Sequence, residues 1–372
     1  MRRLVVVAAA LVLAASPALA GLPRIRAKAF VVESGTTGDR LAGYRARARV
    51  PIASITKLMT VLVALEHARP TAIVTVASGA ASVGESTVHL RPGERITVGD
   101  LLKAALIQSA NDAAQALAYY VGRGSETRFV AMMNARARQL GLRDTRFVRP
   151  DGLDTPGHVS SARDVTLLAR YVMRKPLVRQ IVRQRAAKIG GGRTVHTWND
   201  LLSTFPGVFG VKTGHTTQAG WSEVAAVRRG ATTIYATLLG GPDRGTRNAD
   251  LAALLRWGLA RYRHVEAVTA GRTYARVKLG YGKGKLPLVP QRPLVSLVRI
   301  DRPLVERVVA PIVVTVPVAR GTRLGEVLIF QSGRLLGRRA LVAGRKVSRP
   351  GLLGRVRWYS GRTVHHAWGW VS

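Results

Sequence analysis

Hydrophobic and polar residues recur along this chain with two different periods, and each period predicts one type of secondary structure. From Leu58 to Leu65 the apolar residues follow helical spacing, and the helix that they predict starts near Ser54. Pro70 must end it, because a proline ring clashes with the preceding turn and lacks the N–H that a helix needs. Two further helices are predicted over residues 98–107 and 112–120.

Short apolar runs bounded by glycine and turn residues predict strands elsewhere in the first two thirds of the chain. A strand over residues 29–33 is followed by Ser34-Gly-Thr-Thr-Gly38, which has hairpin turn chemistry, and by a return strand from Leu41. Three later runs predict adjacent antiparallel strands, at residues 210–213, 221–227 and 232–239. The apolar face of residues 250–262 predicts a helix that packs on this sheet.

After Val265 the sequence changes to valine-rich runs broken by Gly and Pro, which is an all-β pattern. The chain is therefore divided into a first domain over residues 21–264 and a small β domain over residues 265–350. Strands in the second domain are predicted at residues 294–300, 312–318 and 327–330. Residues 280–285 lack the last glycine of a dinucleotide loop and the Ser or Thr of a phosphate loop, so a hairpin turn is predicted there.

The two ends of the chain have patterns of their own. Arg2 and Arg3, an apolar run from Leu4 to Ala15 and the small-residue site Ala18-Leu-Ala20 predict a signal peptide over residues 1–20. The alternative is a retained membrane span, but the run is shorter than the about 20 residues needed to cross the hydrocarbon. The mature chain is expected to start at Gly21 and to be exported, to the periplasm or wall space at the outer face of the cell membrane.

Residues 351–372 predict an amphipathic tail that lies on a membrane surface. On a helix, Trp368, Trp370 and most of the aliphatic residues of this segment share one half, while Arg355 and Arg362 fall on the opposite side. Trp358 and its neighbour at position 357 break this pattern. The alternative is a packed or frayed tail, because Gly354, Gly361 and Gly369 each cost about 1 kcal/mol of helix stability.

Charge and composition restrict the possible partners. A formal net charge of +38 would point to nucleic acid in a cytosolic protein, but an exported protein meets acidic lipids and anionic wall polymers instead. No nucleic-acid partner is therefore expected; the alternative to polyanion binding is a basic surface that only keeps the protein soluble. The absence of cysteine excludes disulfides and thiolate metal sites, and the eight histidines show no metal-ligand spacing, so neither a metal nor a cofactor is expected.

Three short motifs carry the candidate chemistry. In Ser54-Ile-Thr-Lys57 the two functional side chains are three residues apart, so on a helix the amine can reach the hydroxyl and serve as its base. A partly buried lysine near another cation can lose its proton near neutral pH, and Lys212 is a candidate for that cation. The alternative is a solvent-facing Ser and Lys on an ordinary helix.

The second motif is Ser109-Ala-Asn111 and the third is Lys212-Thr213-Gly214. Ser109 can relay a proton to a leaving amine and Asn111 can orient a substrate amide, although both residues also favour helix starts. A lysine and a threonine hydroxyl on a strand suit a terminal carboxylate, and the glycine allows substrate backbone to pair along the strand edge.

These motifs, in this order, resemble those of the penicillin-binding proteins and serine β-lactamases, and the flanking sequences are most similar to D-alanyl-D-alanine carboxypeptidases. The similar segments are residues 51–60, 85–118, 152–164 and 211–221. The resemblance implies an α/β fold: a β-lactamase/transpeptidase-like catalytic domain, with an antiparallel sheet flanked by helices, before the small all-β domain and the amphipathic tail.

The resemblance also assigns roles that spacing alone does not. It implies an oxyanion hole made by the backbone N–H groups of Ser54 and His215. Arg247 matches a family arginine that steers the substrate carboxylate, although an exposed arginine at a helix start is an equally good interpretation. Trp198 stands where relatives more often carry a small polar or basic residue, so that side of the pocket is expected to differ.

The implied activity is removal of the terminal D-alanine from peptidoglycan stem peptides, with β-lactams as covalent inhibitors. A D,D-endopeptidase of the same family is the alternative enzyme, and a non-catalytic envelope-binding protein is the alternative outside enzymes. A β-lactamase is disfavoured because no Glu-x-x-x-Asn segment lies between Pro150 and Asp164 to drive rapid deacylation. A Ser-His-Asp hydrolase is disfavoured because the chain has no Gly-x-Ser-x-Gly elbow.

Overall fold

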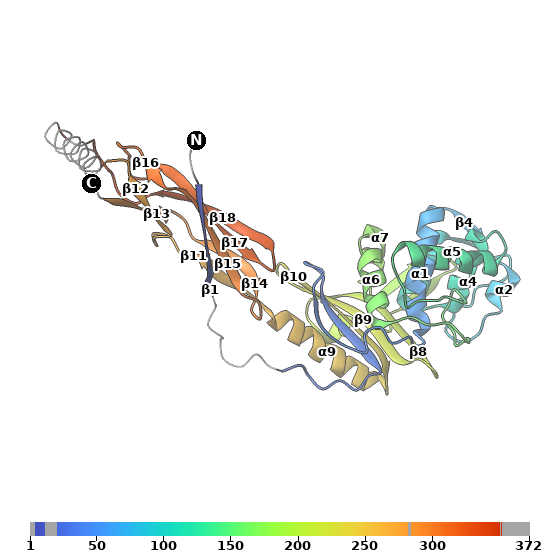
Figure 1. Ribbon diagram of the computed structural model, residues 1–372. Helices are drawn as coiled ribbons and strands as arrows, with labels where there is room; N and C mark the ends of the chain where they lie inside the picture. Colours follow the sequence, from blue (N-terminus) through green and yellow to red (C-terminus); the bar gives the residue numbers. More distant parts are fainter. Residues whose placement is uncertain (1–3, 12–20, 282–283, 350, 352–372) are drawn as a thin grey trace. The chain divides into compact units, whose positions relative to one another are not determined.

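The computed structural model describes the backbone of residues 4–11 and, with their side chains, residues 21–281, 284–349 and Gly351 (Figure 1). The chain divides into two compact units. One unit is Ala20–Ala260; the other runs from Arg261 to the end of the chain and includes the strand β1 (Leu4–Leu11). The predicted cleavage site and the tail beyond Gly351 lie outside the described residues.

The first unit is built on a five-stranded sheet in which neighbouring strands are antiparallel. Its spatial order is β3 (Arg40–Tyr44), β2 (Ala29–Ser34), β10 (Thr232–Gly241), β9 (Gly220–Arg229) and β8 (Val208–Thr216). The predicted hairpin is β2 and β3, and the three predicted adjacent strands are β8, β9 and β10. Both predictions are confirmed, and β8, which carries Lys212-Thr213-Gly214, forms an edge of the sheet.

Two long helices cover opposite faces of this sheet (Figure 1). Helix α9 (Arg244–Ala260) lies against the face that carries Ile234, because a Cβ on Gly258 would approach the Ile234 side chain to 2.8 Å. Helix α6 (Ala162–Val172) lies against the other face, where the Thr166 and Thr237 hydroxyls are 2.7 Å apart. Successive side chains on a strand point to opposite faces, so Ile234 and Thr237 of β10 mark the two sides.

Helix α9 begins six residues before the predicted start at Asp250. Its first turn is polar, so the apolar pattern does not reveal it, and Asp243 caps it instead: the Thr246 N–H donates to Asp243 Oδ1 at 2.7 Å. This earlier start places Arg247 in the first turns of the helix.

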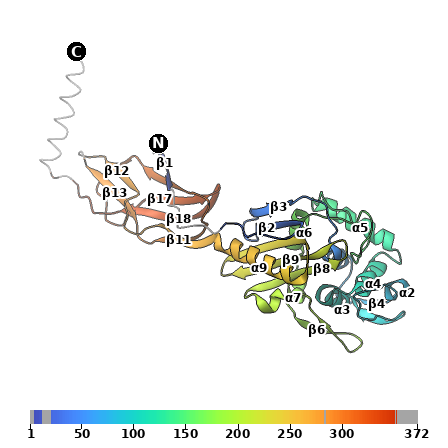
Figure 2. The same ribbon diagram turned by 90° about the horizontal axis from the view of Figure 1, so that it is seen from below.

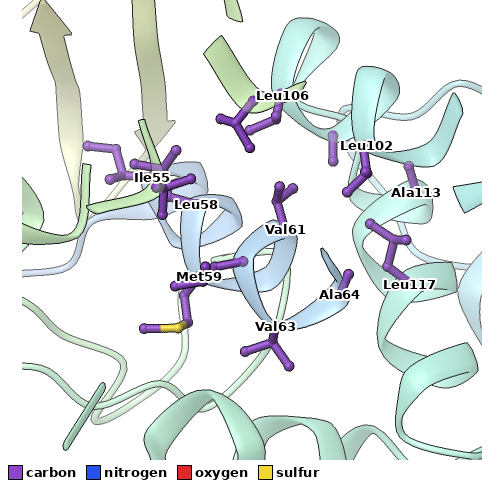
Figure 3. Packing of buried hydrophobic residues seen from close by; sticks show 14 of the residues in the cluster. Ile55, Leu58, Met59, Val61, Val63, Ala64, Leu102, Leu106, Ala113 and Leu117 are labelled. Atoms are coloured by element: carbon purple, nitrogen blue, oxygen red, sulfur yellow. The ribbon is translucent and has the colours of Figure 1, made fainter. Parts of the chain in front are cut away.

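Ser54 lies in a short 3-10 turn, η1 (Ala53–Thr56), and the α-helix α1 (Lys57–His67) follows it directly. Helix α1 is buried through most of its length. Figure 3 shows Val61 and Ala64 facing the helices that carry Leu102 and Leu117, while Met59 and Val63 point to other sides of the core. Close packing on all sides fixes the position of the turn at the head of the helix.

The remaining predicted helices carry the second motif. Residues 98–107 form α3 (Val98–Lys103) followed by a π-helical turn, η2 (Ala104–Gln108), and α4 (Asn111–Val121) comes next. The other elements of this unit are β4 (Ile73–Thr75), α2 (Ser78–Ala81), β5 (Arg95–Thr97), α5 (Glu126–Gln139), α7 (Pro176–Val182), β6 (Ala186–Ile189), β7 (Arg193–His196) and α8 (Leu201–Thr204).

The second unit is made of strands around a separate hydrophobic core (Figure 2). Its main sheet has the order β1, β15 (Leu304–Pro311), β17 (Arg323–Gln331), β18 (Arg334–Ala343), β13 (Lys285–Pro290), β12 (Ala275–Leu279) and β16 (Val313–Val314). A second pair is β11 (Tyr262–Val268) with β14 (Leu294–Arg299).

Two details of the second unit differ from the predicted strands. The run at residues 312–318 forms a strand only at Val313–Val314 and an isolated bridge from Val318 to Val347, and Pro317 between them has no N–H for a ladder. The strand β1 pairs along the whole of β15 and falls inside the predicted signal peptide, so cleavage after Ala20 would leave β15 as the sheet edge.

In the part of the chain that the structure describes, no helix is long and apolar enough to span a membrane.

Candidate active site

The turn that carries Ser54 is held between two glycines from distant parts of the first unit. A Cβ on Gly214 would lie 2.9 Å from the Ile52 carbonyl oxygen, and one on Gly152 would lie 2.1 Å from the Ala53 carbonyl oxygen. Gly152 also has a φ of +88°, which side chains rarely adopt. These positions need glycine because β8 and the Gly152 loop pack directly against the backbone of the turn.

Lys57 is fully buried and donates to three acceptors around the Ser54 hydroxyl. Its Nζ lies 2.7 Å from Ser54 Oγ, 2.7 Å from Asn111 Oδ1 and 2.8 Å from the Asp151 carbonyl oxygen. The predicted pairing of hydroxyl and amine is therefore present, even though Ser54 lies in the 3-10 turn and Lys57 begins the helix. Three acceptors use all three donor positions of the ammonium group.

Burial lowers the pKa of Lys57 from 10.5 to about 7. The charges of Asp151 and Asp112 oppose this shift, and Arg149 adds to it. Arg149 is thus a neighbouring cation in addition to Lys212, the candidate from the sequence analysis. Repulsion between the two lysines is evident at Lys212, since burial and the Lys57 charge both hold the pKa of Lys212 well below its usual value.

Ser109 and Lys212 form the second contact of the site. Ser109 ends the π-helical turn in the left-handed region, with a φ of 68°. The buried Lys212 Nζ donates to Ser109 Oγ at 2.8 Å and to the Thr213 carbonyl oxygen at 2.9 Å. The second motif therefore meets both lysines: Asn111 accepts from Lys57, and Ser109 accepts from Lys212.

The amide of Asn111 is engaged at both ends within the protein. Its Oδ1 accepts from Lys57, and its Nδ2 donates to the Gly84 carbonyl oxygen at 3.1 Å. This arrangement positions Lys57 directly. The orientation of a substrate amide by Asn111 stays a prediction.

The predicted residues surround one cavity of about 240 Å³. It is lined by Ser54, Glu85, Ser86, Ser109, Trp198, Thr213, Gly214, His215, Trp221 and Arg247. Three further predicted residues are buried next to this lining. Lys57 donates to Ser54 and to Asn111, and Lys212 donates to Ser109. All nine residues singled out from the sequence therefore meet at this cavity.

Aromatic side chains form the outer part of the cavity. The His215 ring stacks on Trp221 with centroids 4.1 Å apart. Trp198 is about half exposed and donates from Nε1 to the Gln108 carbonyl oxygen at 3.0 Å. Because Gln108 immediately precedes Ser109, Trp198 packs against the segment that carries the second motif.

Arg247 is buried, so the alternative of an exposed arginine at a helix start is wrong. Its side chain lies 5.6 Å over the Trp221 ring, and its Nε is 3.2 Å from Glu223 Oε2. On its other side it donates to Asn248 Oδ1 at 2.6 Å and lies 3.5 Å from Asp200 Oδ2.

Sequence reasoning missed several residues that hold the site. The Asp151 backbone oxygen accepts from Lys57, and its carboxylate accepts from Arg149 and from Gln115 at 2.9 Å. Burial alone would raise the pKa of Asp151, but the Arg149 hydrogen bonds and the Lys57 charge hold it below its usual value. No spacing rule reveals a contact made through a backbone carbonyl; the only signal was that the next residue, Gly152, begins one of the similar segments. In the described part of the chain no cluster of three or more His, Asp or Glu residues could hold a metal ion.

Comparisons with known proteins agree with this geometry. The profile of the peptidase S11 family, described as D-alanyl-D-alanine carboxypeptidase, matches residues 15–243. The D-alanyl-D-alanine carboxypeptidase DacD of Salmonella typhimurium is 32% identical over 383 residues, covering 96% of this chain and 98% of the relative. A D-alanyl-D-alanine carboxypeptidase of Streptomyces sp. K15 is 33% identical over 269 residues, which are 67% of this chain and 92% of the relative.

Solved structures give the same result. Penicillin binding protein 5 of Haemophilus influenzae has a TM-score of 0.64 and 26% identity, covering 89% of this chain and all of that one. The Streptomyces K15 DD-transpeptidase has a TM-score of 0.62 and 31% identity, covering 65% of this chain and all of that one. The predicted α/β catalytic domain followed by a β-rich domain is confirmed, as is the resemblance drawn from the three motifs. This chain belongs to the peptidase S11 family of D-alanyl-D-alanine carboxypeptidases.

Proposed function

We propose that this serine-type carboxypeptidase removes the terminal D-alanine from peptidoglycan stem peptides through an acyl-enzyme on Ser54. The observation that carries the proposal is the 2.7 Å contact between Ser54 Oγ, at the cavity wall, and the buried Lys57 Nζ. A nucleophile and a base within hydrogen-bond reach are what acyl transfer needs. Pure binding needs neither, so this contact disfavours a non-catalytic envelope-binding protein.

Lys57 acts as the base because a large fraction of it is neutral near pH 7. With a pKa of about 7, roughly half of the amine is unprotonated at that pH, whereas an ordinary lysine is almost fully charged. The neutral amine takes the proton of Ser54 as its oxygen attacks the scissile carbonyl. The negative charge that forms on the carbonyl oxygen is received by the N–H groups of Ser54 and His215.

The proton then passes to the leaving D-alanine amine. Ser109 is the relay, since it lines the cavity and accepts a hydrogen bond from Lys212. Water afterwards attacks the acyl-enzyme, with Lys57 again as the base. Side chains of this protein accept and donate the protons in each proposed step, and the reaction as proposed uses no metal or cofactor.

The terminal carboxylate of the substrate is held at the β8 end of the cavity. Thr213 supplies a hydroxyl, while Lys212 and Arg247 supply positive charge. Gly214 lies on the sheet-edge strand, where a substrate backbone can pair with it. A β-lactam carries a carboxylate beside its reactive carbonyl and is expected to acylate Ser54 in the same way.

The basic surface and the predicted export point to an anionic partner in the cell envelope. A second cavity of about 830 Å³ in the first unit is lined by four exposed arginines: Arg49, Arg138, Arg143 and Arg146. Its only carboxylate among the described lining residues, Asp144, is already paired with Arg47. The proposal is that such surfaces hold the exported enzyme near acidic lipid head groups or wall polymers, and salt-sensitive sedimentation with anionic vesicles or purified wall tests it.

The test of the catalytic proposal is D-alanine release from diacetyl-Lys-D-Ala-D-Ala by the chain from Gly21 onward. Release that disappears in the Ser54→Ala variant supports the carboxypeptidase. A cross-linked dimeric stem peptide, supplied in parallel, tests the alternative D,D-endopeptidase. Faster cleavage of that cross-link than of the linear peptide would reverse the assignment.

A further inference from the structure

A carboxyl group that the proposed mechanism does not use lies directly behind the carboxylate end of the cavity. Glu223, on β9, is fully buried, and its Oε2 is 3.2 Å from Arg247 Nε. Neither carboxyl oxygen meets hydrogen-bond geometry with a donor in the part of the chain described. The contact with Arg247 is therefore one of charge, and it holds only while Glu223 is ionised.

The strand register explains how Glu223 reaches this position. Glu223 pairs with Thr213 across β8 and β9, and residues directly opposite on paired strands have side chains on the same face of the sheet. Trp221, two residues earlier on β9, points to that face as well. The face thus carries Thr213 and Trp221, which line the cavity, and Glu223, on which Arg247 rests.

The charged groups around Glu223 come from three elements. Arg244 and Arg247 come from α9, Lys212 from β8, and Asp200 from the residue before α8. Asp200 accepts two hydrogen bonds from Arg244, one of them from Nε at 2.8 Å, and its Oδ2 lies 3.5 Å from Arg247. Glu223 is the closer of the two carboxylates to Arg247, so its charge has the larger effect on the Arg247 guanidinium.

We propose that Glu223 acts through Arg247 and, by its own charge, sets how strongly the cavity binds the anionic end of the substrate. The inference rests on the proposed role of this end of the cavity in carboxylate binding. An ionised Glu223 offsets the positive charge that the substrate carboxylate meets; a protonated Glu223 leaves that charge unopposed.

The chemistry makes this effect dependent on pH. Burial raises the pKa of Glu223 from 4.5 to about 7, against the opposing charge of Arg247. The group is neutral below that pH and ionised above it. Binding of a carboxylate ligand is therefore strongest in mild acid and weakens as the pH rises through about 7.

The experiment measures ligand affinity in the unreactive Ser54→Ala chain. Calorimetry at pH 6, 7 and 8 gives the Kd of diacetyl-Lys-D-Ala-D-Ala and of the same peptide with a C-terminal amide. From pH 6 to pH 8, the ratio of the Kd of the acid to the Kd of the amide is expected to rise at least about threefold. In the Glu223→Gln variant this additional rise disappears, while the Kd at pH 6 stays within about twofold of the parent value. Lys57 and Lys212 are present in both chains, and the interaction of Lys212 with the Glu223 charge is part of the effect that the comparison measures.

Two variants serve as controls. Glu33 is a second glutamate in a similar setting. Burial raises its pKa and Arg170 contacts it, but it does not line the cavity. Glu33→Gln is expected to leave both peptides' pH dependence unchanged. Glu223→Asp keeps a titratable group and is expected to move the transition to lower pH, and it provides the test if circular dichroism shows that Glu223→Gln does not fold.

The outcomes separate the inference from the proposed function. If acid and amide peptides bind equally in the parent chain, the carboxylate role of this cavity is wrong and the inference fails with it. If the acid binds more tightly but Glu223→Gln keeps the parent's pH dependence, only the inference is overturned. Two results together support both the proposed function and the inference. Arg247→Gln removes the preference for the acid peptide, and Glu223→Gln removes only the pH dependence of that preference.

Discussion

At the scale of single residues, the site depends on side chains whose burial changes their chemistry. Lys57 can act as a base only because it is buried, and its three acceptors fix the amine beside Ser54. The sequence motif identified the pair, since chemistry dictates both residue types and their spacing. The motif could not show that Arg149 is a further assisting cation or that Arg247 is buried, because both depend on distant segments that meet only in the fold.

The lowered pKa of Lys57 predicts the pH dependence of acylation. The neutral amine is the active form, so the second-order rate constant for acylation by benzylpenicillin is expected to fall about tenfold per pH unit below about 7 and to level off above it. Stopped-flow measurement over pH 5 to 9 checks this. A rate that keeps rising to pH 9 would show that Lys57 has an ordinary pKa and is not the base.

The fit of the Ser54 turn against Gly152 predicts a sharp effect of one methyl group. Gly152→Ala introduces a Cβ that would lie 2.1 Å from the Ala53 carbonyl oxygen, so it is expected to lower the acylation rate at least about tenfold and to destabilise the protein by about 1–3 kcal/mol. Gly157→Ala is the matched control, because Gly157 has a similar φ of +80° but nothing closer than 3.9 Å. Equal effects of the two variants would attribute the loss to backbone strain alone.

At the scale of elements, the hydrophobic pattern predicted the catalytic sheet and the main helices well. The core face of α9 was visible in the spacing of its leucines, but its first turn is polar and was missed. The π-helical turn before Ser109 was missed for a related reason, since helical periodicity cannot distinguish a widened last turn from a regular one. Both missed details lie at the active site: the π-helical turn precedes Ser109, and the first turns of α9 carry Arg247.

The loop that carries Asp151 is attached to the Ser54 turn through His158, and this attachment predicts acid sensitivity. Val148 N–H donates to His158 Nδ1 at 3.1 Å, so the neutral ring carries its proton on Nε2, 2.7 Å from Thr56 Oγ1. Burial lowers the pKa of His158 from 6.5 to about 4. The unfolded chain therefore binds more protons between these values, and the free energy of unfolding falls as pH drops from about 6.5 to about 4, by up to about 3 kcal/mol.

Urea unfolding at pH 7, 6, 5 and 4 measures this slope. A His158→Gln chain lacks the titrating ring and is expected to lose that part of the pH dependence, although its stability at pH 7 will be lower because the Thr56 contact changes. The account of the loop is wrong if the parent and the variant show the same slope.

At the scale of the whole molecule, we expect catalysis to need only the first unit. Every residue that lines the catalytic cavity lies within Ala20–Ala260, and the Streptomyces K15 structure, which covers 65% of this chain, is matched along its full length. A chain of residues 21–260 is therefore expected to be acylated by benzylpenicillin within about twofold of the longer chain's rate. A loss of more than tenfold in a folded, monomeric truncation would show that the second unit shapes the site.

The central claim is that Ser54 is the acylated nucleophile, and peptide mapping of the penicillin-treated chain tests it most directly. Trypsin separates the two candidate serines, since Ser54 lies in the peptide Val50–Lys57 and Ser109 in the peptide Ala104–Arg123. The account predicts one adduct of the mass of benzylpenicillin on Val50–Lys57, and none in the Ser54→Ala chain. An adduct on Ala104–Arg123, or one that persists in the variant, would contradict it.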